Sequence, residues 1–96
     1  MTPAAFTVRT TPHYDRLSRK LDKSHRDFDA IEKSAAAILS GDPHNRTRRN
    51  HIKKLEGVAL GEGQYRLSLG RWRFRYDVLS RVVLLSYCGL RREDTY

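Results

Sequence analysis

The fold is decided by residues 64–79, which read QYRLSLGRWRFRYDVL. Apolar and polar side chains alternate on both sides of Gly70, a pattern typical of two strands joined by a tight turn. One face of this predicted β-hairpin carries aromatic rings and leucines, which we expect to lie in the core. The opposite face is dominated by four arginines, Arg66, Arg71, Arg73 and Arg75.

Further strands are predicted on either side of the hairpin. Downstream, residues 82–87 read VVLLSY and are apolar enough to form a central strand, with Tyr87 in the core. Upstream, residues 5–10 alternate in the manner of a short strand. The pattern therefore predicts strands before and after a helical region.

Two amphipathic helices are expected in that region. The first opens at Thr11-Pro12, because threonine caps a helix and proline tolerates its first position. Residues 24–27 interrupt the periodicity, and the second helix stops at Gly41, with Pro43 beyond it. The short joint predicts an antiparallel helical hairpin.

The segment 42–63 is expected to be a loop, and it concentrates positive charge. Ile52 and Leu55 interrupt the charges, which suggests a segment anchored to the core with its basic side chains outward. Such a run is usually a solvated face. Its basic residues are Arg46, Arg48, Arg49, His51, Lys53 and Lys54.

The predicted fold is a single α+β domain over residues 1–96. A strand, a helical hairpin and a three-strand antiparallel meander would form a four-stranded sheet, with the helices on one face. The arginine face would stay open on the other side.

The charge balance favours a polyanionic partner. The chain has 19 Lys and Arg against 11 Asp and Glu, a net charge of +8 over 96 residues. This excess suits a nucleic acid, an anionic membrane or an acidic protein. Neighbouring arginines on one face repel each other, and bound phosphates would relieve that repulsion. Acidic residues elsewhere in the chain, or an acidic partner, would relieve it equally well.

Several other classes of protein are disfavoured. Cys88 is the single cysteine, so no intramolecular disulfide can form, and we expect it to pack in the core. The four histidines and this cysteine show no metal-ligand spacing, and we expect no metal and no cofactor. The sequence shows no signal pattern and no apolar stretch near 20 residues, so we expect a cytoplasmic protein without a membrane partner.

Three segments, taken in order, resemble the RelE/ParE toxin superfamily. They are residues 53–57 (KKLEG), residues 64–78 (QYRLSLGRWRFRYDV) and residues 89–93 (GLRRE), followed by Tyr96. Together they are similar to the family's K-L-x-G, Y-R-L-R-x-G-x-Y-R-x-x-Y-x-V and G-x-R-R-x-x-Y elements. The resemblance covers nearly the whole chain and agrees with the predicted order of strands and helices.

This resemblance implies a toxin of a type II toxin–antitoxin pair. The family's ribonuclease members cut mRNA in the ribosomal A site without a metal ion. The ribose 2′-hydroxyl attacks the adjacent phosphate and leaves a 2′,3′-cyclic phosphate and a 5′-hydroxyl. The implied partners are an acidic, partly disordered antitoxin, mRNA and the 70S ribosome.

The resemblance also implies roles for individual residues. Arg66 would grip the phosphate, Arg73 would stabilise the transition-state charge, and Arg91 would lie near the leaving group. Tyr96 would stack on a base and assist proton removal. The basic residues expected to bind RNA are Lys53, Lys54, Arg49, Arg71 and Arg75.

Two departures from the family pattern concern the general base. Ser68 stands where the best-known ribonuclease member has a lysine, and serine is a poor base. His51 is one replacement, because an imidazole titrates near neutral pH, although it also fits a solvated loop histidine. The spacing between Arg92 and Tyr96 also differs by one residue from the usual pattern, which affects whether Tyr96 reaches the site.

Two other functions remain open at this point. A sister of the gyrase-inhibiting members would share the fold, act on a protein and need no nuclease site; Ser68 favours it, whereas the three arginines favour the nuclease. A non-catalytic, basic RNA-binding module would need only the charge.

Overall fold

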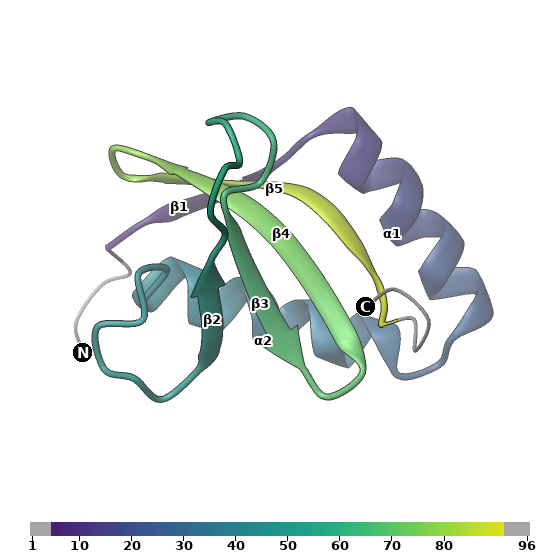
Figure 1. Ribbon diagram of the computed structural model, residues 1–96. Helices are drawn as coiled ribbons and strands as arrows, with labels where there is room; N and C mark the ends of the chain where they lie inside the picture. Colours follow the sequence, from purple (N-terminus) through teal and green to yellow (C-terminus); the bar gives the residue numbers. More distant parts are fainter. Residues whose placement is uncertain (1–4, 92–96) are drawn as a thin grey trace.

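A five-stranded sheet with two helices on one face forms the protein (Figure 1). The computed structural model describes residues 5–91. The elements, in chain order, are β1 (Thr7–Thr10), α1 (Pro12–Ser24), α2 (Phe28–Gly41), β2 (His51–Lys54), β3 (Tyr65–Leu69), β4 (Trp72–Leu79) and β5 (Val82–Leu90).

The strand order is β1-β5-β4-β3-β2. The predicted hairpin is confirmed: β3 and β4 pair antiparallel around Gly70, whose φ of 58° suits the tight turn. The predicted central strand is also confirmed, because β5 lies between β4 and a parallel β1. It is longer than expected and runs to Leu90.

The sheet was expected to have four strands, with residues 42–63 as a loop, but it has five strands. Residues 51–54 form β2, an edge strand that pairs antiparallel with β3 and sets Lys53 opposite Arg66. The sequence HIKK holds a single apolar residue, Ile52, so it has no period-two pattern to reveal it. Backbone pairing with β3, rather than burial of its side chains, makes this segment a strand. As a result, part of the basic run lies on the sheet.

The first helix begins for the reason that the sequence suggests. Thr11 caps α1, and its Oγ1 accepts a hydrogen bond of 3.1 Å from the amide of Tyr14. α1 packs mainly on β5, whereas α2 contacts β1 and β3. The two helices diverge from their short joint instead of running alongside each other as an antiparallel hairpin would (Figure 1).

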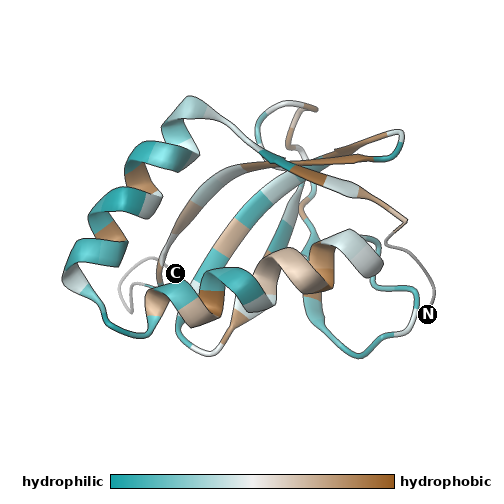
Figure 2. Ribbon diagram, turned by 180° about the vertical axis from the view of Figure 1, so that it is seen from behind, coloured by the Kyte–Doolittle hydropathy of each residue, from teal (hydrophilic) through white to brown (hydrophobic). Residues whose placement is uncertain are grey.

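The core lies between the helices and the sheet. Figure 2, seen from behind, shows both helices in front of the same sheet face. Leu67, Trp72, Phe74 and Tyr76 are buried there, as the alternation of the hairpin predicts. Cys88 is buried with them, and burial raises the pKa of its thiol to about 12. The opposite face carries no helix (Figure 1) and is called the open face below.

The expectation that Tyr87 lies in the core is wrong. A register shift opposite Arg75 and Tyr76 leaves Ser86 without a direct partner in β4. Such a bulge reverses the alternation of side chains beyond it. Tyr87 therefore lies on the open face, 38% exposed, while Cys88 turns inward.

Candidate functional site

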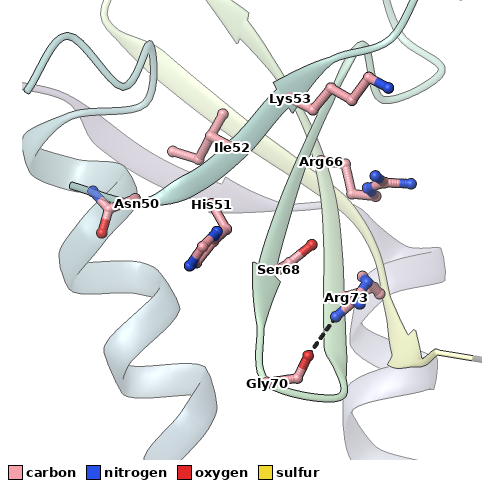
Figure 3. Close-up of a pocket in the computed structure, with 8 residues that line it drawn as sticks. All are labelled: Asn50, His51, Ile52, Lys53, Arg66, Ser68, Gly70 and Arg73. Carbon is pink, nitrogen blue, oxygen red and sulfur yellow. Dashed lines mark hydrogen bonds between the residues drawn. The ribbon is translucent and has the colours of Figure 1, made fainter. Parts of the chain in front are cut away.

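An open hollow of about 570 Å³ lies on the open face, across β2, β3 and β4 (Figure 3). A second depression adjoins it and reaches the end of β5. The two depressions share the lining residues Lys53, Arg66 and Arg73. The two together are called the basic hollow. Its lining residues are Asn50, His51, Ile52, Lys53, Arg66, Ser68, Gly70, Arg73 and Arg91.

The register of the strands explains this convergence. His51 pairs with Ser68, and Ser68 pairs with Arg73, so these three residues form one row across β2, β3 and β4. Figure 3 shows Ser68 between the other two. In the next row Lys53 pairs with Arg66. Paired residues on neighbouring strands project to the same face, and their side chains therefore meet over the hollow.

Arg73 is oriented by the turn beside it. Its Nη1 donates a hydrogen bond to the carbonyl of Gly70 (2.6 Å; Figure 3). The same nitrogen also donates to the carbonyl of Trp72 (2.9 Å). These bonds direct one edge of the guanidinium to the backbone. A planar group held in this way is preorganised for a ligand.

Arg91 joins the hollow through the end of β5. Its amide donates a 2.8 Å hydrogen bond to the carbonyl of Arg71, which extends the pairing with the hairpin past Leu90. The sequence therefore predicted the grouping of Arg66, Arg73 and Arg91 correctly. Four cationic side chains, these three and Lys53, line one depression.

The electrostatics of the basic hollow favour an anion. Among the lining residues that the structure describes, none is Asp or Glu. Lys53 stands directly opposite Arg66, an arrangement in which like charges destabilise a sheet. A phosphate, which guanidinium groups contact two oxygens at a time, would offset that repulsion.

Arg75 lies on the same face as Arg73 but outside the basic hollow. Its Nε and Nη2 donate to the carbonyl of Gly63 at 3.1 and 2.9 Å. Next to it the fully buried carboxylate of Asp77 accepts from the amides of Gly63 (2.9 Å) and Gln64 (3.1 Å). The loop 55–64 is thereby fixed over this end of the face. Arg75, which is expected to bind RNA, therefore contacts the loop and does not line the basic hollow.

Of the other residues expected to bind RNA, Lys53 lines the basic hollow, whereas Lys54, Arg71 and Arg49 lie outside it. Lys54 projects to the opposite side of β2 from Lys53, with its Nζ 5.7 Å from the centre of the Tyr65 ring. Arg71 does not lie on the arginine face, since the turn interrupts the alternation and leaves its guanidinium 5.7 Å from the Trp72 ring centre. Arg49 is exposed in the loop between α2 and β2.

The remaining residue of the expected site is Tyr96, which lies outside the described residues. Sequence reasoning also missed Ser68 as a lining residue in its own right, as well as Asn50, because neither carries charge. Within residues 5–91, no three His, Cys, Asp or Glu side chains lie close enough together to hold a metal ion. In the same range neither helix is long and apolar enough to span a bilayer.

Comparison with known proteins gives matches only among solved structures. No protein-family model and no curated protein matches the chain. A chain of the RelBE2 toxin–antitoxin complex of Mycobacterium tuberculosis superposes with a TM-score of 0.66 and 24% identity, over 91% of this chain and 99% of that one. A chain of the archaeal RelE–RelB complex of Pyrococcus horikoshii gives 0.62 and 24%, over 93% and 98%.

These likenesses confirm the resemblance to RelE-type proteins at the level of the fold. Both extend over nearly the full length of each chain, so the likeness concerns the fold as a whole and not one part of it. A fold supports many activities, and the chemistry has to be argued from the basic hollow.

Proposed function

We propose that this protein is the toxin of a type II toxin–antitoxin system and that it is a metal-independent endoribonuclease acting on mRNA. The observation that carries this proposal is the convergence of Lys53, Arg66, Arg73 and Arg91 on one depression. The shared fold with chains of two toxin–antitoxin complexes supports the first part. The positive charge of the depression supports the second part, the endoribonuclease activity.

The proposed reaction is attack of a ribose 2′-hydroxyl on the adjacent phosphate. The phosphorus gains a fifth oxygen in the transition state, and negative charge accumulates on its non-bridging oxygens. Preorganised cations aimed at developing charge are among the strongest catalytic devices in proteins. Arg73, whose guanidinium is directed by two carbonyls, suits that role. Arg66 suits phosphate binding in the adjacent row.

The leaving 5′-oxygen needs a proton or an equivalent positive charge. Arg91 enters the basic hollow from the end of β5, on the opposite side from β2. This placement suits a contact with the leaving oxygen while Lys53 and Arg66 hold the phosphate from the β2 side. We assign that contact to Arg91.

The 2′-hydroxyl must lose its proton, and His51 is our candidate for the general base. It lies in the same row as Ser68 and Arg73 and lines the same depression. An imidazole that lines the same hollow as the phosphate-binding arginines is a suitable group to accept the proton. Ser68, which lies between them, leaves room for a ribose.

We also propose the biological setting that the fold suggests. The RNA would be mRNA in the A site of the 70S ribosome, in the cytoplasm, and the partner would be an acidic antitoxin. The net charge of +8 supports both polyanionic partners. An antitoxin that covers the basic hollow would block the same cations that RNA needs.

The test is cleavage of ribosome-bound mRNA by purified protein, mapped by primer extension. Wild type should cut within codons and leave a 2′,3′-cyclic phosphate. A matched control is Arg19→Ala on α1, which removes one exposed positive charge far from the basic hollow. Absence of cuts by wild-type protein, with or without ribosomes, would refute the nuclease.

A gyrase-inhibiting protein of the same fold is the second candidate. Ser68 is the observation that favours it, since the expected lysine is missing from the hollow. This function predicts DNA-damage signalling after expression and no new RNA ends. The same primer-extension experiment therefore separates the two.

A further inference from the structure

Tyr87 is an exposed aromatic side chain that the proposed reaction does not yet use. Three large apolar or aromatic side chains among residues 5–91 are strongly exposed: Leu60 (55%), Leu79 (40%) and Tyr87 (38%). Leu60 lies in the loop 55–64 and Leu79 at the end of β4. Tyr87 alone of these three projects from the interior of a strand onto the open face.

The ring of Tyr87 lies along its own strand, over Gly89. A Cβ atom at position 89 would come within 2.5 Å of the phenol oxygen and 2.9 Å of the ring carbon that bears it. Gly89 is buried although it lies on the open face, because this ring covers it. Gly89 has an ordinary backbone conformation, so its position does not require a glycine for a turn. A glycine is needed here because a side chain would collide with the Tyr87 ring.

This placement sets the phenol beside the basic hollow. Gly89 pairs with Arg73, and strands in a sheet lie about 4.8 Å apart. Arg91, two residues further along β5, lines the hollow. The ring therefore borders the phosphate-binding cations, with one side on the backbone of Gly89 and part of its surface exposed to solvent.

We infer that Tyr87 is an RNA-binding residue that stacks on an unpaired base next to the cleaved phosphate, an inference that rests on the proposed ribonuclease function. An aromatic ring next to arginines is how proteins hold single-stranded RNA: the cations take the backbone and the ring takes a base. The ring is placed before RNA arrives, because Gly89 leaves room for its phenol end. The bulge at Ser86 turns it toward the RNA side.

The experiment compares three variants under steady-state conditions on ribosome-bound mRNA. Tyr87→Leu keeps an apolar side chain without a π-face, and it should raise KM roughly 5- to 100-fold, the range for loss of one base stack. Tyr87→Phe keeps the ring and should restore KM to within about threefold of wild type. Gly89→Ala should displace the ring and raise KM in the same direction as the leucine variant.

Leu60→Ala is the matched control, since it removes an exposed apolar side chain away from the basic hollow, and it should leave KM as it is. Circular dichroism and the fluorescence of Trp72 check that each variant is folded. A wild-type KM in Tyr87→Leu would overturn the inference. So would a fall in kcat with an altered pH profile in Tyr87→Phe, because the hydroxyl would then be the important group. If wild type itself cuts no RNA, the proposed function fails, which is a separate result.

Discussion

Arg73 and Arg75 lie two positions apart on β4 and project to the same face. Their side chains nevertheless have different contacts. Arg73 borders the basic hollow and is directed by the carbonyls of the turn beside it. Arg75 donates two hydrogen bonds to Gly63 and holds the loop 55–64. Segments from elsewhere in the chain, and not the strand itself, therefore decide what surrounds each arginine.

Asp77 extends this difference along the strand. It continues the same face past Arg75, and its buried carboxylate receives two amides of the loop. One end of the open face is thus closed by a carboxylate and an arginine, while the other end stays open and cationic. The following predictions test whether the two ends have separate roles in stability and in activity.

The largest effect is expected at the open end. Arg73→Ala should lower the rate of RNA cleavage about 100- to 1000-fold, the usual result of removing one donor that stabilises transition-state charge. The melting temperature should change far less than the cleavage rate, because removing one charge from a group of like charges offsets part of the loss of the hydrogen bonds to Gly70 and Trp72. Single-turnover cleavage and differential scanning fluorimetry measure the two quantities. Wild-type cleavage by a folded Arg73→Ala protein would contradict this role.

At the closed end the expected effect is on stability. Asp77→Ala should lower the free energy of unfolding by about 2–3 kcal/mol, because two amides lose a charged acceptor in a buried place. For a domain of this size that corresponds to a melting temperature lower by roughly 10–20 °C. Urea unfolding followed by Trp72 fluorescence gives the value. An unchanged midpoint would show that the loop does not depend on this carboxylate.

Arg75→Ala is expected to have an intermediate effect on the same loop. The free energy of unfolding should fall by about 1 kcal/mol, the usual net value for a hydrogen-bonded contact to a single carbonyl. Hydrogen exchange should speed up at the amides of Gly63 and Gln64 and stay slow at Phe74 in the core. Cleavage should fall less than tenfold. A loss of cleavage as large as that of Arg73→Ala would mean that both ends bind RNA.

The smallest expected effect is a loss of stability at low pH in a second loop, residues 42–50, which the carboxylate of Asp42 holds. Partial burial of Asp42 would raise its pKa, but hydrogen bonds from the Thr47 hydroxyl and from the amides of Arg46 and Thr47 outweigh this and lower it. A pKa lowered by folding adds stability above the unfolded value of about 4, and this is lost as the pH falls below it. NMR titration of residues 46–50 should show the loop loosening only below about pH 4. Loosening near neutral pH would assign the effect to another group.

The hairpin of residues 64–79, both helices and the grouping of Arg66, Arg73 and Arg91 could be predicted from the sequence. These features rest on short-range rules: alternation in strands, capping by Thr11, and a glycine at the turn. The RelE-type resemblance added the arrangement of the arginines. The loop histidine, His51, was named as a candidate, but its position beside Ser68 depends on β2, which the sequence did not reveal.

Sequence alone determined which side chains share a face wherever a strand runs without a bulge or a turn, because alternation is a property of the extended backbone. Tertiary structure decided what each face meets. The edge strand β2, the bulge that turns Tyr87 outward and the loop that occupies Arg75 all depend on pairing between segments distant in the chain. No local pattern encodes such pairing, since its free energy comes from hydrogen bonds and contacts that exist only once the chain has folded.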